Sequence, residues 1–329
     1  MYFALDIGGT FVKYAVMDGE AGIIENGKFP TPNGPGCTAG ELTDRIGDVF
    51  DKCREHHDFA GVAVSLPGMI DVENGIVYEG GALTYMDGVP FGRLLSERCG
   101  GLPVVLENDA KCAALAEIWK GNAVGARSAV LFIFGTGIGG AVVLDGKVVH
   151  GKNLSAGEFS YLLLQNLQRE DIPEMLSMWR QPPLSMDEQF EGPAFHLTSR
   201  LSAAGICYRV AKRKGLAFAE VDGHRIYRWV DKGDRDVIEV LEDVYFEIAR
   251  ECCNLQFIFD PDVILIGGGI SAEPRFVEGI QRYAKELQGF TRALRGLDIR
   301  VCKFKNDANL VGALRNFLTL YPWHSNLED

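Results

Sequence analysis

The sequence carries little positive charge for its length and shows no regular cysteine pattern. It has 33 lysine and arginine residues against 45 aspartate and glutamate residues, which gives a formal net charge of −12. A nucleic-acid surface needs clustered basic side chains to neutralise phosphates, so this balance argues against nucleic-acid binding. The eight cysteines include no paired CxxC motif, and Cys252 and Cys253 are adjacent on one expected helix. We interpret them as reduced packing residues.

Long apolar runs are also missing. No hydrophobic segment reaches the length that crosses a bilayer, and Met1 directly precedes an expected strand, which leaves no room for a signal peptide. We therefore expect a cytoplasmic protein that does not bind membranes. The hydrophobic share of 47% is ordinary for a globular chain. A chain of 329 residues is long enough for two domains, each with its own core.

The first seventeen residues predict a strand, a glycine turn and a second strand. Tyr2–Asp6 ends in an acid, Ile7-Gly8-Gly9-Thr10 forms the turn, and Phe11–Met17 is the second strand. Glycines let backbone N–H groups approach phosphate oxygens, and the threonine hydroxyl adds a donor. Asp6 is placed to hold Mg²⁺, directly or through water. An ordinary hairpin with a Gly-Gly turn explains the segment equally well.

A second glycine turn favours the phosphate-binding interpretation. The apolar run Ser128–Phe134 precedes Gly135-Thr136-Gly137-Ile138-Gly139-Gly140, and another strand, Ala141–Leu144, follows. A unit of strand, Asn-Asp-Ala and helix also occurs twice, at Asn108 and at Asn306. The pattern indicates two related halves, each with a phosphate-binding turn, which suits a nucleotide held in a cleft between them.

A third glycine turn follows the buried strand Asp262–Ile266. Its glycines, Gly267-Gly268-Gly269, would let a flat ring such as adenine approach the backbone closely. Tight packing of the following helix against the strand is a competing explanation for these glycines.

With these three turns in this order, the chain resembles the ROK family of sugar kinases and repressors, within the actin-like, hexokinase-like ATPase superfamily. The resemblance covers nearly the whole chain and implies an α/β fold. It implies two actin-like (ribonuclease H-like) α/β domains that flank a nucleotide and sugar cleft. Six motifs carry it, each weak alone but specific together: Asp6-Ile7-Gly8-Gly9-Thr10 with Lys13, Leu66-Pro67-Gly68-Met69-Ile70-Asp71, Glu107-Asn108-Asp109-Ala110, Gly135-Thr136-Gly137-Ile138-Gly139-Gly140, Ala156-Gly157-Glu158 and Gly267-Gly268-Gly269-Ile270.

The resemblance implies an ATP- and Mg²⁺-dependent kinase that phosphorylates the 6-hydroxyl group of a hexose or β-glucoside. Asp109 is the candidate general base, because it lies where a strand ends and a helix begins. Its alternative role is that of a helix N-cap. We expect Gly68, Asn108, Glu158 and Tyr161 to contact the sugar together with Asp109.

The nucleotide is expected to bind the three glycine turns. Lys13 has either a minor role near the phosphates or a purely structural one. The residues expected to bind the cofactor are Asp6, Gly8, Gly9, Thr10, Lys13, Thr136, Gly137, Gly268 and Gly269.

Departures from the family pattern bear on zinc and on the substrate. Most relatives carry a histidine three positions after the glutamate, and then a cysteine run that binds structural zinc. Here Tyr161 replaces the histidine and no cysteine lies between Cys112 and Cys207, so we predict no structural zinc. Relatives commonly show Asn-Leu in place of Ala82-Leu83, so one sugar contact is expected to be missing. Zinc-free relatives with Gly-Glu-Phe look like β-glucoside kinases, which is our predicted activity, with glucokinase and N-acetylmannosamine kinase as alternatives.

The predicted domain division is discontinuous. Residues 1–120 and 306–329 form the N-terminal domain, closed by the C-terminal helix, and 121–305 form a larger domain with a helical block over 198–260. The proline-bearing stretch 171–193 is expected to be a loop with one helical turn. We expect a homodimer. A sugar-responsive repressor would need a DNA-binding segment ahead of the first glycine turn, so this alternative is disfavoured.

Overall fold

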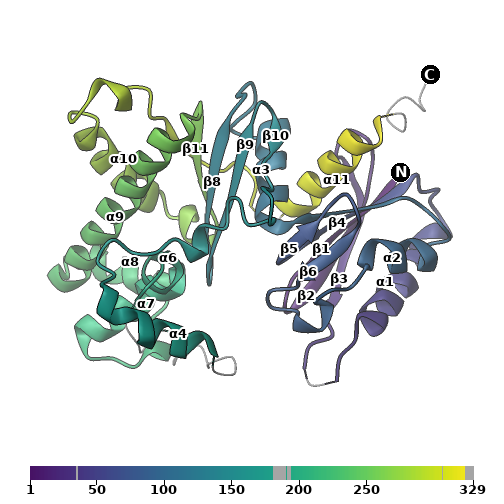
Figure 1. Ribbon diagram of the computed structural model, residues 1–329, viewed down its shortest axis with the longest axis horizontal. Coiled ribbons are helices and arrows are strands. Elements are labelled where there is room, and N and C mark those ends of the chain that lie inside the picture. The colour runs from purple at the N-terminus through teal and green to yellow at the C-terminus, as the bar shows by residue number, and fades with distance from the viewer. Residues whose placement is uncertain (35, 181–189, 191–193, 306, 323–329) are drawn as a thin grey trace. The chain divides into compact units, whose positions relative to one another are not determined.

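The computed structural model describes residues 1–34, 36–180, 190, 194–305 and 307–322 (Figure 1). Contacts between residues group the chain into two compact units. Unit 1 comprises Met1–Gly125, Lys147–Ala156 and Lys303–Asp329, and unit 2 comprises Ala126–Gly146 and Gly157–Cys302. From the sequence we expect residues 147–156 in the second domain, whereas their contacts lie in unit 1. These units are sets of contacts, so the domain division itself stays a prediction.

Unit 1 is built on a five-stranded sheet with the order β3-β2-β1-β4-β7. β1 pairs antiparallel with β2, which confirms the predicted hairpin, and β1, β4 and β7 are parallel to one another. The carboxyl ends of these three strands therefore meet at one edge of the sheet. A small hairpin pairs β5 (Met69–Asp71) with β6 (Ile76–Glu79). The strands of the main sheet are β1 (Tyr2–Ile7), β2 (Phe11–Met17), β3 (Ile23–Pro30), β4 (Gly61–Leu66) and β7 (Val104–Asn108).

Different helices cover the two faces of this sheet, because side chains alternate along each strand. On one face, apolar residues of β1 pack with α1 (Ala39–Arg54) and α2 (Phe91–Arg98). On the other face, β1 packs with α3 (Asp109–Lys120) and α11 (Ala308–Leu320). By this alternation Asp6 belongs to the face that α3 and α11 cover.

The C-terminal helix α11, yellow in Figure 1, packs against α3 within unit 1. The two backbones approach so closely that a Cβ atom on Gly312 would lie 1.7 Å from the Cys112 carbonyl oxygen. Phe317 is completely buried, which stabilises the fold by about 2–3 kcal/mol. Asn306, in the second Asn-Asp-Ala sequence, lies outside the described residues.

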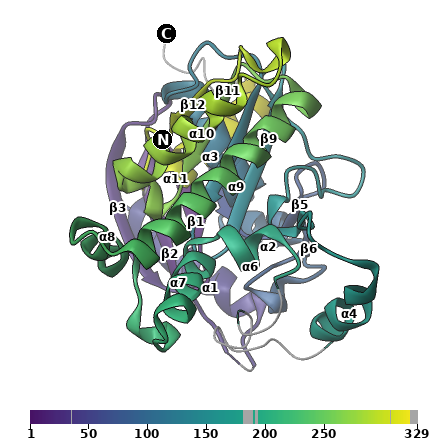
Figure 2. The ribbon, with the colours of Figure 1, turned by 90° about the vertical axis from the view of Figure 1, so that its left-hand side faces the viewer.

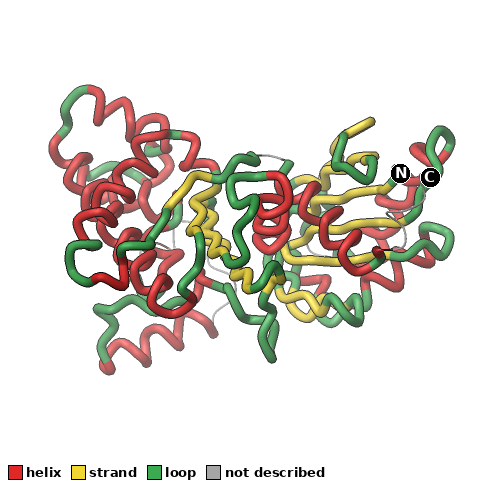
Figure 3. The backbone as a smooth tube through the Cα atoms, turned by 90° about the horizontal axis from the view of Figure 1, so that it is seen from above, coloured by secondary structure: helices red, strands yellow, loops and turns green. Residues whose placement is uncertain are grey.

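The sheet of unit 2 repeats the topology of unit 1. Four of its strands run in the order β9-β8-β11-β12, with β8 and β9 antiparallel and β8, β11 and β12 parallel. Unit 1 has the same arrangement in β2-β1-β4-β7, which supports the two related halves predicted from the sequence. Figure 3 shows the strands of each unit in yellow. These strands are β8 (Ala129–Phe134), β9 (Ile138–Leu144), β11 (Val263–Gly267) and β12 (Ile299–Val301), and the short β10 (Lys147–Val148) follows β9 in the chain.

Helices make up most of the remainder of unit 2. Among the described residues they include α6 (Leu197–Leu201), α7 (Ala203–Lys214), α8 (Gly223–Asp231), α9 (Arg235–Phe259) and α10 (Pro274–Leu287). α9 and α10 pack side by side (Figure 2). The run from α6 to α9 confirms the helical block predicted over residues 198–260.

One segment differs from its prediction. Prolines led us to expect a loop with one helical turn over residues 171–193, but α4 (Ile172–Arg180) is a helix of nine residues. Pro173 is the second residue of α4, where the missing N–H group removes no intrahelical hydrogen bond, so the proline is compatible with a helix. Residues 181–189 and 191–193 lie outside the described part of the chain.

The structure also bears on two absences noted in the sequence. Over the described ranges, no helix has both the length and the apolar character needed to cross a bilayer. No disulfide joins any two of the eight cysteines, all of which are described. Cys252 and Cys253 are buried in α9, where they act as packing residues, as predicted.

Candidate active site

Three polar residues line up at the carboxyl ends of the parallel strands of unit 1. Asp6 on β1 is in register with Ser65 on β4, and Ser65 is in register with Glu107 on β7. All three are buried. Ligands of α/β proteins bind outside the carboxyl ends of parallel strands, so this edge is the natural place for a site.

Asp6 is held by two partners. Lys13 lies opposite it in the hairpin, and its Nζ atom contacts Asp6 Oδ2 at 3.0 Å. Asn309 on α11 donates from Nδ2 to Asp6 Oδ1 at 2.9 Å. The ion pair gives Lys13 a structural contact, and its proximity to phosphates stays a prediction. A carboxylate has about four lone-pair positions, so Asp6 can still accept from a water molecule of a hydrated cation.

Two residues that follow β3 fix the carbonyl groups of the first glycine turn. Thr31 donates from Oγ1 to the Gly8 carbonyl group at 2.6 Å, and from its backbone N–H to that of Thr10 at 3.0 Å. Asn33 donates from Nδ2 to the Gly9 carbonyl group at 3.1 Å. The conformation of the turn is therefore set by the protein itself.

The fold does not require glycine at the tip of this turn. A Cβ atom on Gly9 would lie 3.5 Å from the Ala82 Cβ atom, an ordinary van der Waals distance. A Cβ atom on Gly8 would lie 3.3 Å from the Phe11 carbonyl oxygen, which is a tight contact with the backbone. Gly9 has neither a packing nor a conformational reason for glycine, which favours close approach of a ligand there.

Asn108, rather than Asp109, caps the helix after β7. Asn108 Oδ1 accepts the N–H group of Lys111 at 3.1 Å, and its Nδ2 donates to the Gly68 carbonyl group at 3.0 Å. Asp109 is the first residue of α3, and its Oδ1 accepts the Ala110 N–H group at 2.8 Å. The capping alternative considered for Asp109 is therefore wrong, and its carboxylate lies at a helix N-terminus, where negative charge is stabilised.

Gly68 connects this position to the β5–β6 hairpin. Its φ is +101°, and a Cβ atom would lie 1.8 Å from the Glu79 carbonyl oxygen. Only glycine fits here. The Gly68 backbone and the Asn108 side chain are thus brought together, as expected for two residues of one pocket wall.

Glu107 has a partner that the sequence did not reveal. His150 donates from Nε2 to the Glu107 carboxylate, with contacts of 2.9 and 3.2 Å to the two oxygens. The Asn108 N–H group donates to Glu107 Oε1 at 2.8 Å. The side chain of Glu107 is 1% exposed, so these donors satisfy a buried acid.

The second glycine turn is held by α6 and α7. Thr198 Oγ1 accepts the Ile138 N–H group at 3.1 Å, and the Gly135 carbonyl group accepts the Ala203 N–H group at 2.9 Å. A Cβ atom on Gly137 would lie 3.7 Å from the Thr198 methyl group. Thr136 and Gly137 are exposed, and as in the first turn the fold leaves space beside the glycine.

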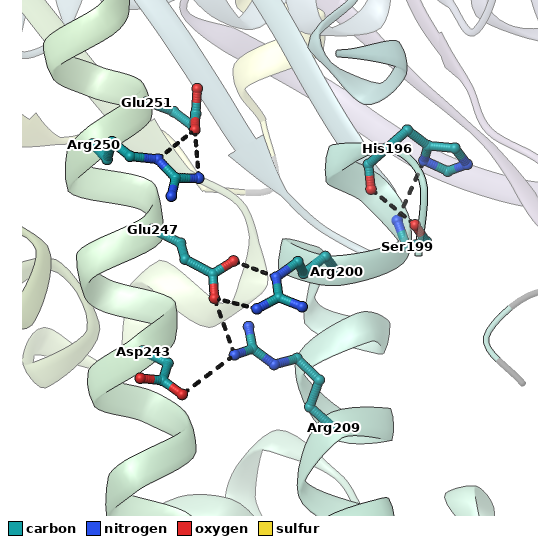
Figure 4. Close-up of polar contacts among 8 residues, drawn as sticks. All are labelled: His196, Ser199, Arg200, Arg209, Asp243, Glu247, Arg250 and Glu251. Atoms are coloured by element: carbon teal, nitrogen blue, oxygen red, sulfur yellow. Dashed lines mark hydrogen bonds and ion pairs between the residues drawn. The ribbon is translucent and has the colours of Figure 1, made fainter. Parts of the chain in front are cut away.

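Helix α6 is anchored in turn by a charged cluster on α9 (Figure 4). Arg200 of α6 donates two hydrogen bonds to Glu247, one from Nη2 at 2.7 Å and one from Nε, and Arg209 of α7 donates to Glu247 at 3.1 Å. At the start of α6, the Ser199 N–H group donates to His196 Nδ1 at 3.4 Å. Burial lowers the pKa of His196, so its imidazole is neutral at neutral pH and can accept this bond.

Glu158 and Tyr161 lie on one short turn of unit 2. Gly157, with φ of +84°, passes close to β9, and Phe159 anchors the turn by packing on Phe132 with ring centroids 4.7 Å apart. The Tyr161 N–H group donates to the Glu158 carbonyl group at 3.2 Å. Tyr161 is 47% exposed, so the structure keeps its ring at the surface of the unit.

The third turn has a packing reason for one of its glycines. Gly268 has φ of +90°, and a Cβ atom there would lie 2.3 Å from the Phe134 carbonyl oxygen. Gly269 has no atom within 4 Å of an added Cβ. Gly268 thus packs against the neighbouring strand β8, which is not the helix–strand packing considered from the sequence, and an adenine site at this turn stays a prediction.

Several residues that support these turns were missed by sequence reasoning. Asn309, Thr31, Asn33, Thr198 and His150 each contact a motif far from them in the chain. None belongs to a local pattern that marks a site. They are found only through the tertiary structure.

Comparison with known proteins identifies the family. The model of the ROK family matches residues 2–319. The β-glucoside kinase of Klebsiella pneumoniae is 31% identical over 319 residues, which are 97% of this chain and 96% of that protein. The glucokinase of Halalkalibacterium halodurans is 29% identical over 330 residues, which cover 94% of this chain and 93% of that protein.

A solved structure agrees. A ROK family protein from Streptococcus pneumoniae TIGR4, crystallised in complex with sucrose, superposes with a TM-score of 0.79 at 27% identity, covering 98% of this chain and 99% of that one. The predicted α/β, actin-like fold is thereby confirmed. The chain belongs to the ROK family.

Proposed function

We propose that the protein is an ATP-dependent sugar kinase that phosphorylates the 6-hydroxyl group of a hexose or β-glucoside, with Asp109 as general base. The observation that carries this proposal is the position of Asp109. It begins α3 at the carboxyl end of β7, and Asn108 performs the capping role beside it. Membership of the ROK family and the names of the two relatives support the same activity.

The reaction follows from these positions. The sugar 6-oxygen attacks the γ-phosphorus of ATP, and its proton passes to the Asp109 carboxylate. The bond between the γ-phosphorus and the β–γ bridging oxygen breaks, and ADP leaves. The N-terminus of α3 and the buried strand ends hold the carboxylate in place.

The nucleotide phosphates would contact Gly8, Gly9 and Thr10 of the first turn, and Thr136 and Gly137 of the second. The space beside Gly9 and Gly137 supports this assignment. The adenine would approach Gly268 and Gly269.

Asp6 fits the role of holding Mg²⁺ through a bound water molecule. Among the residues that the structure describes, no three His, Cys, Asp or Glu side chains cluster as a metal site. Mg²⁺ in kinases is commonly held by one or two carboxylates together with the substrate phosphates, so a single acid is compatible with it. When bound, the ion would neutralise charge on the transferred phosphoryl group. Lys13 and Asn309 orient Asp6 for this role.

For the sugar we propose contacts from Gly68, Asn108, Asp109, Glu158 and Tyr161. Asn108 uses one amide hydrogen for Gly68, which leaves the second for a hydroxyl group. The exposed ring of Tyr161 offers an aromatic face for the second ring of a disaccharide or for an aryl group.

A β-glucoside is the substrate we propose, with glucose and N-acetylmannosamine as alternatives. The Klebsiella β-glucoside kinase supports the first choice and the Halalkalibacterium glucokinase the second. The test is the ratio of kcat/KM for cellobiose to kcat/KM for glucose, because specificity is a ratio of these constants. A ratio above one is expected. A preference for free glucose would overturn the substrate but leave the kinase activity intact.

We also propose a cytoplasmic homodimer. Large apolar side chains are exposed at the end of α9 (Phe257 and Ile258) and after α10 (Phe290), which supports contact with a second copy. Light scattering should give twice the chain mass of 36.1 kDa. The mass of a single chain at micromolar concentration would contradict the dimer.

A further inference from the structure

A buried acid and a histidine form a pair next to the proposed general base. Glu107 is the last residue but one of β7, and Asn108 and Asp109 follow it directly. Burial of a carboxylate is costly unless donors satisfy it, so Glu107 depends on its partners. These are the N–H group of Asn108 at 2.8 Å and His150 Nε2 at 2.9 Å.

His150 also sets the conformation of its own segment. Its carbonyl group accepts the Ala156 N–H group at 3.1 Å, which closes the loop between them. Gly151 allows the loop to close tightly, with φ of +75° and an added Cβ only 3.2 Å from the Ala156 Cβ atom. Gly157 and Glu158 directly follow Ala156 in the chain.

We propose that His150 is a positioning residue of the phosphoryl-transfer site. Its imidazole holds Glu107 and thereby the backbone that carries Asn108 and Asp109. The same bond anchors the start of the loop that His150 and Ala156 close and that leads to Glu158. The role rests on the proposed functions of Asp109 and Glu158, and His150 itself touches neither ATP nor the sugar in this proposal.

The competing explanation is that His150 only neutralises a buried charge. In that case replacing both residues by uncharged ones would restore wild-type hydrogen exchange and wild-type kcat/KM. A positioning role instead needs a hydrogen bond between the two side chains, because that bond fixes the distance between their segments.

Amide hydrogen exchange tests the role without requiring turnover. In His150→Ala, exchange in peptides that cover residues 108–111 and 156–159 should accelerate by roughly tenfold or more, with the first glycine turn unchanged. His150→Gln keeps a donor at a similar reach and should stay within about threefold of the wild type. Unchanged exchange in both segments of folded His150→Ala would overturn the proposal.

Kinetics give a second, separate readout. His150→Ala should lower kcat/KM for the sugar by about tenfold to a hundredfold, because small displacements of reacting groups have effects of this size. His150→Gln should recover most of that loss. If the wild-type protein phosphorylates no sugar, the proposed function fails, and the exchange measurement alone then decides the positioning role.

Two further variants cover the remaining outcomes. Should His150→Ala not fold, Glu107→Gln/His150→Ala removes the buried charge and allows the same measurements. We expect this double variant to fold and still to show fast exchange in both segments, and wild-type exchange would overturn the proposal.

His57→Ala is the matched control, because His57 also pairs with a glutamate of unit 1, Glu25, at 3.4 Å. This variant should change neither hydrogen exchange in the two segments nor kcat/KM.

Discussion

At the end of β7, two neighbouring residues have different tasks. Asn108 satisfies the N-terminus of α3 and the Gly68 carbonyl group, so its side chain is tied into the fold. Asp109 occupies the first helical position, where the helix dipole favours its negative charge. The sequence Asn-Asp-Ala recurs at Asp307, which caps α11 without a side-chain hydrogen bond. The motif alone therefore does not distinguish a catalytic acid from a helix start.

Replacement of Asp109 by asparagine should abolish most turnover and leave the fold intact. The amide keeps the shape of the side chain but cannot accept the hydroxyl proton, so kcat should fall by roughly 10²–10⁴-fold. Nucleotide affinity and melting temperature should change little. Asp307→Asn, at the corresponding position of the second motif, is the control and should retain full activity. Near wild-type kcat in Asp109→Asn would remove Asp109 from the mechanism.

His196 should make stability depend on pH. Burial lowers its pKa in the folded protein from the ordinary value of 6.5, so the unfolded chain binds the proton more readily. The pH-dependent contribution of His196 to the free energy of unfolding is therefore fully present above about pH 7. It is lost as the pH falls below 6.5 towards the lower pKa of the folded state. His196→Asn keeps a capping acceptor without this titration and should flatten the dependence.

The measurement is the free energy of unfolding by urea between about pH 5 and pH 7.5. His224→Asn, at an exposed position on α8, is the control and should keep the wild-type slope. Equal slopes for the wild type and His196→Asn would show that His196 does not contribute to this dependence.

At the scale of elements, the three glycine turns differ although their sequences are alike. The first two leave space beside Gly9 and Gly137, whereas Gly268 is fixed by its positive φ and by the Phe134 carbonyl oxygen. Sequence alone could not separate these cases, because both kinds of turn follow an apolar strand. Only the backbone distances show which glycines the fold requires.

Alanine at Gly9 should therefore affect ATP binding, whereas alanine at Gly268 should affect the stability of the fold. Gly9→Ala should weaken ATP binding by roughly tenfold or more and change the unfolding free energy by less than about 0.5 kcal/mol. Gly268→Ala should destabilise the protein by about 1–3 kcal/mol or more, because the side chain meets a carbonyl oxygen at positive φ. Calorimetric titration with ATP and urea unfolding provide the two measurements. A destabilised Gly9→Ala with normal affinity would contradict the assignment of the first turn.

Local patterns predicted the sheets and the main helices well, and long-range partners poorly. The hairpin β1–β2 and the helices from α6 to α9 follow from alternation and helical periodicity, which are local properties. The sequence predicts only one helical turn where α4 has nine residues, because proline disfavours a helix interior, whereas Pro173 lies in the first turn. The partners of Asp6 and Glu107 could not be predicted, because Asn309 and His150 lie 303 and 43 residues away along the chain.

The two sheets share one topology, and each has a glycine turn after its first strand. The departure from most ROK proteins is the segment after Glu158, where tyrosine stands in place of the zinc-binding histidine and the expected cysteines are missing.

We predict that the purified protein contains no structural zinc. Metal analysis should find well below one zinc ion per chain, because the thiolate and imidazole ligands are missing from the sequence after Glu158. A chelator should leave the melting temperature unchanged, since no metal would contribute to folding. Stoichiometric zinc with a chelator-sensitive melting temperature would contradict this reading of the segment.

We propose above all that the protein transfers the γ-phosphoryl group of ATP to a sugar 6-hydroxyl group. The most direct test is to incubate the purified protein with ATP, Mg²⁺ and each of cellobiose, gentiobiose, glucose and N-acetylmannosamine, and to follow ADP release and the phosphorylated product by NMR. We expect sugar-dependent ADP release, with one phosphate per ADP found on a 6-oxygen. Sugar-independent ATP hydrolysis, phosphate on another oxygen, or no turnover of any of these sugars would contradict it.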